Sequence, residues 1–306
     1  MSTRFLRRGL LLLSLATPLG LVALAARTGG PGQRVPVRQQ RTTVTQHVGA
    51  FGYPDGVAVD ASGTVYVVDT DNAAVKKVNG AGEVSVFIGA GLVYPTSVAI
   101  GADGSVYITD AGSHRLHKAS PAGGLTTLAE GLKYPTGVAV APDGTVYVVD
   151  AGTEANQGAV RRISPVGRMT TLADDFNRPG GIAVAADGTV YVADTDDNAI
   201  RKVLPNGQVM TLATSGLNKP HGLAVDPAGT LYVADTYDNS IEKITPTGSS
   251  TLLAGSFNYP SGVAMAADGS VYVTDTGTGA LKKVTPAGVI LTLAGLVARL
   301  ATYVVG

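Results

Sequence analysis

The stretch PTGVAVAPDGTVYVVD at residues 135–150 decides the fold of this chain. Close relatives of it occur six times, each opening on a proline and ending on an aspartate. The prolines are Pro54, Pro95, Pro135, Pro179, Pro220 and Pro260, and the aspartates are Asp69, Asp110, Asp150, Asp194, Asp235 and Asp275. Both series are spaced 41, 40, 44, 41 and 40 residues apart. A fixed period of this length indicates a repeat architecture.

Each repeat contains four short segments of strand-forming residues. In the first repeat they are Gly56–Val59, Thr64–Asp69, Val75–Val78 and Val84–Ile88, separated by Gly, Asp and Asn. β-Branched and aromatic residues bounded by such turn formers are typical of strands. A single four-stranded unit cannot bury both of its faces, whereas six units arranged radially can. The sequence therefore predicts an all-β, six-bladed β-propeller of four-stranded antiparallel blades. A tyrosine in the second strand of each repeat is expected to fill the space between blades.

The two ends of the repeat array offer competing outer strands for the last blade. Thr42–Val48 precedes the first proline and resembles an outer strand, and so does Val289–Leu293 at the other end. We expect the N-terminal strand to complete the sixth blade, because this arrangement ties the ring shut without a free sheet edge. Residues 296–306 would then form a C-terminal tail.

The N-terminal segment has the layout of a secretory signal peptide. Residues 1–8 carry three arginines and no acid, residues 10–26 are mostly apolar, and Ala23-Leu24-Ala25 offers a cleavage site. The pattern predicts a signal peptide at residues 1–26, a flexible linker at 27–41 and the propeller at 42–295. Export to the periplasm, cell envelope or medium follows from this interpretation. An uncleaved membrane anchor remains the alternative.

Composition excludes several classes of protein. The 306 residues contain no cysteine, which excludes a disulfide scaffold or a zinc-finger array. The 45% hydrophobic content is too high for a disordered chain. The formal net charge of zero argues against a nucleic-acid partner, which requires a clustered basic surface.

The repeat resembles the NHL repeat. The shared pattern is Pro-x-Gly-Val-Ala-Val-x-x-x-Gly-x-Val-Tyr-Val-x-Asp, and Ser113–Leu116 is similar to the loop that follows it. The resemblance covers about residues 42–295. It implies a propeller, but it leaves the activity open, because NHL-like propellers include binders of proteins, RNA and small ligands as well as enzymes.

Candidate binding residues follow from the geometry of a propeller. The residue after each proline begins an innermost strand, so these six side chains should surround one mouth of the central channel. They are Asp55, Thr96, Thr136, Gly180, His221 and Ser261. Variable polar residues on a repeated framework are where specificity is expected. The loop of the third repeat is longer than the others, and we expect Glu154 in this insert to lie over the same face.

Other recurring charges are interpreted as structural. The six strand-ending aspartates are expected to accept backbone N–H groups of the following turn, because every repeat needs the same contact. The basic residue repeated in the third strand is given a structural or solvated role. These positions are Lys77, Lys118, Arg162, Lys202, Lys243 and Lys283.

The sequence offers no assembled catalytic or metal centre. His47, His114, His117 and His221 fall on different elements, so no two of them are expected to converge on one ion. Five further acids accompany Asp55 on the predicted mouth face, which makes that face acidic and suited to Ca²⁺ or another divalent cation. They are Asp71, Glu154, Asp196, Asp197 and Asp238. No cofactor is predicted beyond this cation.

The most economical interpretation is an extracytoplasmic, monomeric binding module. Its partner would be a protein, a small molecule or a carbohydrate held at the channel mouth, with no catalytic residues. The alternative is a metal-dependent lyase or lactonase, by resemblance to streptogramin lyases and gluconolactonases built on six-bladed propellers.

Overall fold

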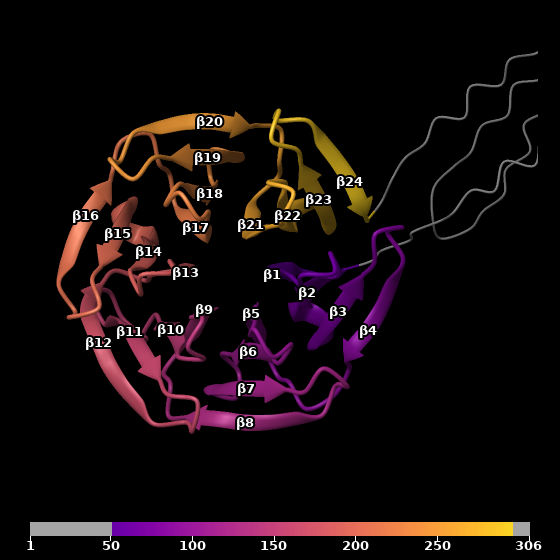
Figure 1. Ribbon diagram of the computed structural model, residues 1–306, viewed down its shortest axis with the longest axis horizontal. Coiled ribbons are helices and arrows are strands. Elements are labelled where there is room, and N and C mark those ends of the chain that lie inside the picture. Colours follow the sequence, from indigo (N-terminus) through magenta and orange to yellow (C-terminus); the bar gives the residue numbers. More distant parts are fainter. Residues whose placement is uncertain (1–50, 296–306) are drawn as a thin grey trace, which may run out of the picture. The chain divides into compact units, whose positions relative to one another are not determined.

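The computed structural model describes residues 51–295 and confirms the predicted six-bladed propeller. Six four-stranded antiparallel sheets form a ring (Figure 1), and each sheet runs from an inner to an outer strand in chain order. The inner strands are β1, β5, β9, β13, β17 and β21. The expected strands of the first repeat match the observed ones to within two residues.

The strands have the following bounds. Blade 1 contains β1 (Pro54–Val59), β2 (Val65–Asp69), β3 (Ala74–Val78) and β4 (Val84–Ile88). Blade 2 contains β5 (Pro95–Ile100), β6 (Val106–Asp110), β7 (Arg115–Ala119) and β8 (Leu125–Glu130). Blade 3 contains β9 (Pro135–Val140), β10 (Val146–Asp150), β11 (Gly158–Ile163) and β12 (Met169–Phe176). Blade 4 contains β13 (Ile182–Val184), β14 (Val190–Asp194), β15 (Ala199–Val203) and β16 (Val209–Ala213). Blade 5 contains β17 (Pro220–Val225), β18 (Leu231–Asp235), β19 (Ser240–Ile244) and β20 (Ser250–Ala254). Blade 6 contains β21 (Pro260–Met265), β22 (Val271–Asp275), β23 (Ala280–Val284) and β24 (Ile290–Ala294).

Helical structure within residues 51–295 is limited to three single turns. They are the 3₁₀ segments η1 (Thr70–Asn72), η2 (Thr195–Asp197) and η3 (Thr276–Thr278), which join the second and third strands of blades 1, 4 and 6. Across the same residues, no helix has the length and apolar character that crossing a membrane would require.

The expected closure of the ring by an N-terminal strand is wrong. Blade 6 takes its outer strand from β24, so all four of its strands come from one continuous stretch of chain. Thr42–Val48 lies outside the described residues. The two outer-strand patterns in the sequence were equivalent by composition, and only the pairing of β24 with β23 distinguishes them.

Blades 6 and 1 are joined through side chains. The Thr276 hydroxyl donates a hydrogen bond to the Pro54 carbonyl at 2.6 Å, and the Thr274 hydroxyl donates to the Asp55 carbonyl at 2.5 Å. Phe51 is buried against Leu281 and other apolar residues of both blades. Within residues 51–295, hydrogen bonds and apolar burial therefore join blades 6 and 1 without a strand shared between them.

The apolar core lies between neighbouring blades. The six second-strand tyrosines are all buried, as predicted, and Tyr66 packs against side chains of both blade 1 and blade 2. In four blades the repeated basic residue of the third strand lies over the aromatic ring of this tyrosine. In blade 2, for example, Lys118 Nζ is 5.2 Å from the centre of the Tyr107 ring. A cation over an aromatic face stabilises the pair, which supports the structural role assigned to these residues.

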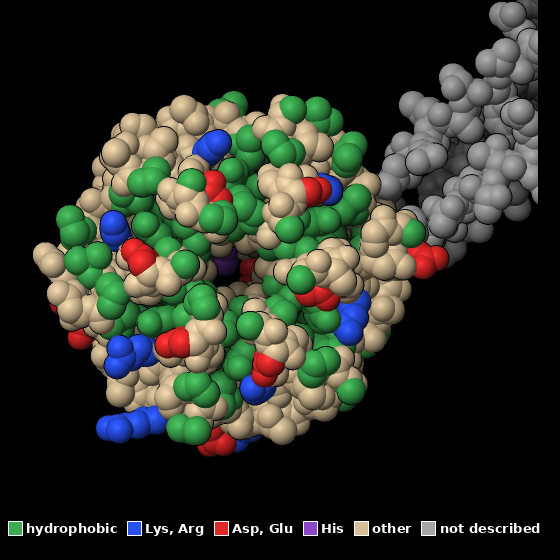
Figure 2. All heavy atoms as spheres, in the orientation of Figure 1, with side chains coloured by type: hydrophobic (Ala, Val, Ile, Leu, Met, Phe, Trp, Pro, Cys, Tyr) green, Lys and Arg blue, Asp and Glu red, His purple; other side chains and the backbone are tan. Residues whose placement is uncertain are grey.

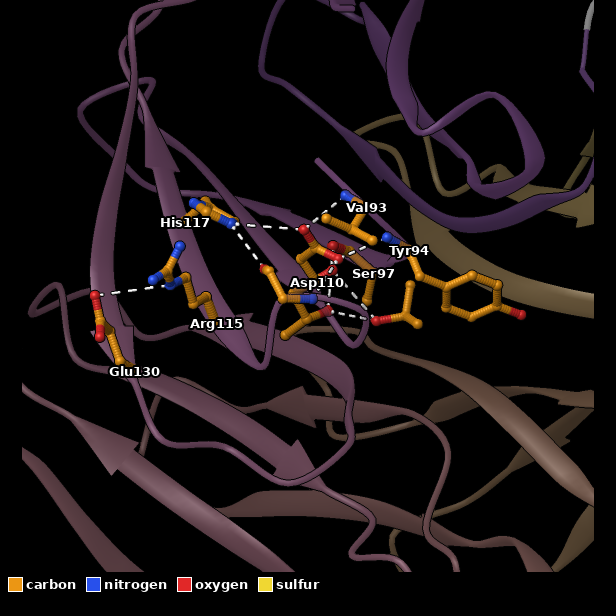
Figure 3. A network of polar contacts seen from close by, with 10 residues as sticks. Val93, Tyr94, Ser97, Asp110, Arg115, His117 and Glu130 are labelled. Carbon is orange, nitrogen blue, oxygen red and sulfur yellow. Dashed lines mark hydrogen bonds and ion pairs between the residues drawn. The ribbon is translucent and has the colours of Figure 1, made fainter. Parts of the chain in front are cut away.

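The strand-ending aspartates fasten the loop that leads into each inner strand. In blade 2, Asp110 accepts the backbone N–H groups of Val93 and Tyr94 at 2.9 and 2.7 Å (Figure 3). Burial raises the pKa of Asp110, but hydrogen bonds from His117 and these N–H groups outweigh burial and hold it below its usual value. The structural role of these aspartates is as predicted, but the segment that supplies their N–H donors is not the predicted one. The main N–H donors precede the inner strand rather than follow the aspartate.

Candidate functional site

Four of the six residues after the prolines line a narrow central cavity, and Ser261 and Gly180 lie outside its lining beside His221. In five blades a β-bulge follows the proline, so that two residues of the inner strand face one of its neighbour. Bulges of this kind redirect side chains and are frequent beside binding sites. Asp55, Thr96, Thr136 and His221 line the cavity, whose volume is about 50 Å³. A histidine and an acidic side chain are visible inside the central opening in Figure 2.

A hydroxyl group links every blade to the next around this cavity. In each case a threonine donates to the carbonyl of the next blade's proline, at 2.6–2.9 Å. Blades 1, 4, 5 and 6 use the threonine that follows the strand-ending aspartate. Blades 2 and 3 have Ala111 and Ala151 at that position and use Thr96 and Thr136 instead. The ring of six predicted site residues therefore divides into two groups.

Thr96 and Thr136 belong to the framework. Their hydroxyls replace the missing threonine of their own blades, and Thr96 is buried and also donates to Thr109. In blades 4, 5, 6 and 1 the threonine after the strand-ending aspartate donates to the next blade's proline carbonyl. The residue after the proline is therefore not needed for this contact, and we call its position released. These four blades are consecutive around the ring. Their released positions are Gly180, His221, Ser261 and Asp55.

The released side chains form one connected polar group. The Ser261 hydroxyl hydrogen-bonds the Asp55 carboxylate and lies 3.1 Å from His221 Nδ1. Gly180 makes room for the imidazole, because a β-carbon at position 180 would lie 2.7 Å from His221 Cδ2. Asp55, Ser261 and His221 thus form a continuous line of an acceptor, a hydroxyl and an imidazole. We refer to these three residues as the mouth triad.

The Asp55 carboxylate lies in an unfavourable place for a charge. Burial raises its pKa, and the nearby His221 and the Ser261 hydroxyl only partly offset this effect. Asp55 is surrounded by protein but keeps some contact with solvent, because it lines the narrow central cavity. A group held at this cost without a backbone partner for its carboxylate is a candidate for function.

A set of tyrosines that the sequence analysis missed borders the mouth. The residue before the proline is tyrosine in four blades and basic in the other two. The positions are Tyr53, Tyr94, Tyr134, Arg178, Lys219 and Tyr259. All four tyrosines are 40–49% exposed. Burial raises the pKa of Tyr53, and the charge of Asp55 raises it further, so this phenol lies near the mouth triad. The sequence could have indicated this set, because the position before the proline holds only tyrosine or a basic residue in all six repeats.

The structure adds two details about the predicted mouth face. Glu154 is absent from the cavity lining, and its carboxylate instead accepts a hydrogen bond from Gln157 at 3.1 Å within the exposed insert. The face is also not uniformly acidic. Asp196 pairs with Lys219 at 3.0 Å, and Arg201 pairs with Asp197 at 2.8 Å.

The remaining histidines are structural wherever they are described. His114 Nδ1 lies 2.7 Å from the Lys133 carbonyl oxygen, and His117 is buried beside Asp110. His47 lies outside the described residues. Among residues 51–295, no three or more His, Cys, Asp or Glu side chains form a group that could hold a metal ion.

Comparisons with solved structures support the fold. A catalytically inactive variant of Staphylococcus aureus virginiamycin B lyase, with quinupristin, is 17% identical over 78% of this chain and 83% of that one, with a TM-score of 0.60. A Xanthomonas campestris gluconolactonase is 18% identical over 80% and 88%, with a TM-score of 0.67. A chain of a nidogen/laminin complex is 22% identical over 71% and 87%, with a TM-score of 0.65. Likeness at this level shows a common propeller fold.

The family comparison reaches further than the fold. No curated protein matches the chain. The model of the virginiamycin B lyase family matches residues 39–294, which is most of the chain and all six blades. The NHL resemblance of the repeat remains a prediction from its pattern. By the extent of the family match, the chain belongs to the virginiamycin B lyase family.

Proposed function

We propose that this propeller is an extracytoplasmic binding module that holds a small hydroxyl-rich ligand, such as a sugar, at the mouth triad. The observation that carries the proposal is the division of the ring. The fold requires Thr96 and Thr136, whereas another threonine has released Asp55, His221 and Ser261 from the same duty. Side chains that the framework does not need, and that converge on a cavity, are candidates for ligand contact.

The chemistry of the mouth favours hydroxyl groups. The triad offers a carboxylate acceptor, a hydroxyl and an imidazole, which together can accept and donate hydrogen bonds to neighbouring hydroxyls. A cavity of about 50 Å³ accommodates a group of the size of one or two water molecules, not a whole ring. The ligand's ring would rest outside, where exposed tyrosines such as Tyr53 and Tyr94 present flat apolar surfaces.

Changing His221 to alanine is expected to weaken binding about tenfold, or ~1.4 kcal/mol. A neutral imidazole has an N–H donor on one ring nitrogen and an acceptor on the other, so alanine would remove both from the mouth triad. Isothermal titration with glucose, glucosamine and N-acetylglucosamine would measure the effect. His114→Asn is the matched control, because it removes a histidine outside the cavity lining and asparagine tolerates the φ of 60° there. Equal affinities in the wild type and His221→Ala, or no binding of these sugars, would contradict the proposal.

A lyase is the second candidate, and the family match favours it. The mouth triad could support proton transfer without a metal, since Ser261 connects the imidazole of His221 to the carboxylate of Asp55. In such a reaction His221 would accept or deliver a proton, and Asp55 would stabilise the charged imidazole. The small cavity would then act on one group of a ligand that lies mostly on the rim.

Quinupristin distinguishes the two candidates, because it is the compound seen with the related S. aureus enzyme. Chromatographic loss of quinupristin on incubation with the wild type, abolished in His221→Ala, would establish a lyase and reject the binding-only account. An unchanged quinupristin concentration together with sugar binding would support the binding module.

A further inference from the structure

Five blades place a basic side chain beside their strand-ending aspartate from one register position of the third strand. It is Lys or Arg in four blades and His117 in blade 2. That position pairs with the centre of the second strand in every blade. Its nitrogen lies 2.5–3.7 Å from the aspartate Oδ2. The five pairs are Lys76 with Asp69, His117 with Asp110, Arg161 with Asp150, Arg201 with Asp194 and Lys282 with Asp275. Figure 3 shows this arrangement in blade 2, where His117 faces Asp110.

Blade 5 breaks the rule with the opposite charge. Glu242 occupies the register position, opposite Val233 in β18. Asp235 remains buried, and its Oδ1 accepts the Asn218 N–H at 2.6 Å as in the other blades. Its Oδ2, which receives the cation elsewhere, has no hydrogen-bond partner among the described residues. A second carboxylate thus stands where the other five blades place a basic side chain.

The described residues around Asp235 do not supply a substitute cation. The Glu242 carboxylate is held by the hydroxyls of Ser250 and Ser240 at 2.8 and 3.4 Å. The nearby Asp238 adds a third negative charge, and its Oδ1 accepts from Asn218 Nδ2 at 2.9 Å. Burial raises the pKa of Asp235 to about 6, and the charges of Asp238 and Glu242 add to the increase. This group of residues therefore combines negative charge, oxygen atoms and a buried Asp235 oxygen without a hydrogen-bond partner among the described residues.

We propose that a hard metal cation binds between Asp235 and Glu242 and takes the place of the missing side-chain cation of blade 5. The donors are all oxygens, namely two carboxylates and the hydroxyl of Ser240, which is the set that Ca²⁺, Mg²⁺ and Na⁺ prefer. Asp235 and Glu242 alone are fewer than the three acidic or histidine ligands of a preformed site, so water completes the coordination. The ion has a structural role and lies outside the mouth triad.

The repeat itself provides the test. Full-length protein is stripped with a chelator at pH 7.5, exchanged into choline chloride buffer and titrated separately with CaCl₂, MgCl₂ and NaCl while thermal melting is followed. At least one of these ions should raise the Tm of the wild type saturably, because ligands of the native state stabilise it. Glu242→Lys restores the pattern of the other blades. It should melt higher than the wild type in chelator and lose the response to the ion.

Two further variants make the result decisive. Glu242→Gln keeps the size of the side chain and should weaken the ion response at least tenfold. Lys283→Gln in blade 6 removes a charge next to the register position of Lys282, far from Asp235 in the sequence, and should leave the ion response unchanged. A wild-type Tm indifferent to all three ions would overturn the proposal and leave a shared proton as the occupant. An equal response in wild type and Glu242→Lys would also overturn it, because the ion would then bind elsewhere.

Discussion

Asp275→Asn is expected to lower the free energy of unfolding by about 3 kcal/mol. Asparagine keeps the size of the side chain and can still accept the Asn258 N–H at 2.6 Å, so the change removes mainly the charge. Lys282 Nζ lies 2.5 Å from Asp275 Oδ2, and its side chain is only 14% exposed. Removing one partner of a buried pair leaves the other charge without compensation, which costs about 3–5 kcal/mol. Chemical denaturation at pH 7.5 measures the loss.

Asp235→Asn is the matched comparison and should not lower the free energy of unfolding. In chelator its free energy of unfolding should equal or exceed that of the wild type, because Asp235 Oδ2 has no hydrogen-bond partner among the described residues. The pKa of about 6 in the folded state exceeds the ordinary value of 3.8. The folded state therefore binds the proton more tightly, and the stability that this gives is lost as pH rises through about 6. Asp235→Asn should remove this decline. Equal losses in both variants would show that the two aspartates have the same role.

Gly222→Ala is the second change with a large expected effect, a loss of about 3 kcal/mol in the free energy of unfolding. A β-carbon at position 222 would lie 2.1 Å from the Ser261 carbonyl oxygen and 2.8 Å from the Val263 nitrogen. Both atoms belong to the backbone of the next blade, so blades 5 and 6 would have to move apart. Overpacking of this kind typically costs 1–3 kcal/mol and occasionally more.

The control for Gly222→Ala lies at the same repeat position in blade 2. Ser97 already carries a β-carbon there, so Ser97→Ala should change stability by less than about 0.5 kcal/mol. Urea unfolding of the two variants measures the difference. Similar stabilities for Gly222→Ala and the wild type would mean that the inner strands tolerate a wider spacing than the structure has.

The period of the sequence predicted most of the fold. Six prolines and six aspartates at matched spacing set the blades, and alternation with turn glycines located the strands. The closing strand was not predictable, because Thr42–Val48 and Val289–Leu293 carry the same outer-strand pattern. Strand pairing, which the structure supplies, assigns the outer strand of blade 6 to the C-terminal segment.

The placement of the post-proline side chains at the central channel was predictable from the sequence, but their division of roles was not. Register alone places Asp55, His221 and Ser261 at one mouth. That Thr96 and Thr136 serve the framework follows from a compensation visible in the sequence, because Ala111 and Ala151 stand where the other blades have threonine. The meaning of that exchange depends on which carbonyl each hydroxyl reaches. Likewise, Glu242 departs from the repeat, but only the pairing of β19 with β18 relates it to Asp235.

The central claim is that the mouth triad serves a ligand and not the fold. Burial raises the pKa of Asp55, so the folded state favours its protonated form, and the stability this confers is lost as pH rises above the usual range of the carboxyl. Asparagine at position 55 would remove the charge and keep a hydrogen-bonding group beside Ser261. Thr96→Val, by contrast, would leave the Pro135 carbonyl without its donor, which costs roughly 1–3 kcal/mol.

The free energy of urea unfolding at pH 7.5, compared between Asp55→Asn and Thr96→Val, tests this claim most directly. If the mouth triad serves a ligand, Asp55→Asn should be at least as stable as the wild type, and Thr96→Val should be less stable by about 1–3 kcal/mol. A loss in Asp55→Asn equal to or greater than that in Thr96→Val would place Asp55 in the framework and contradict the account.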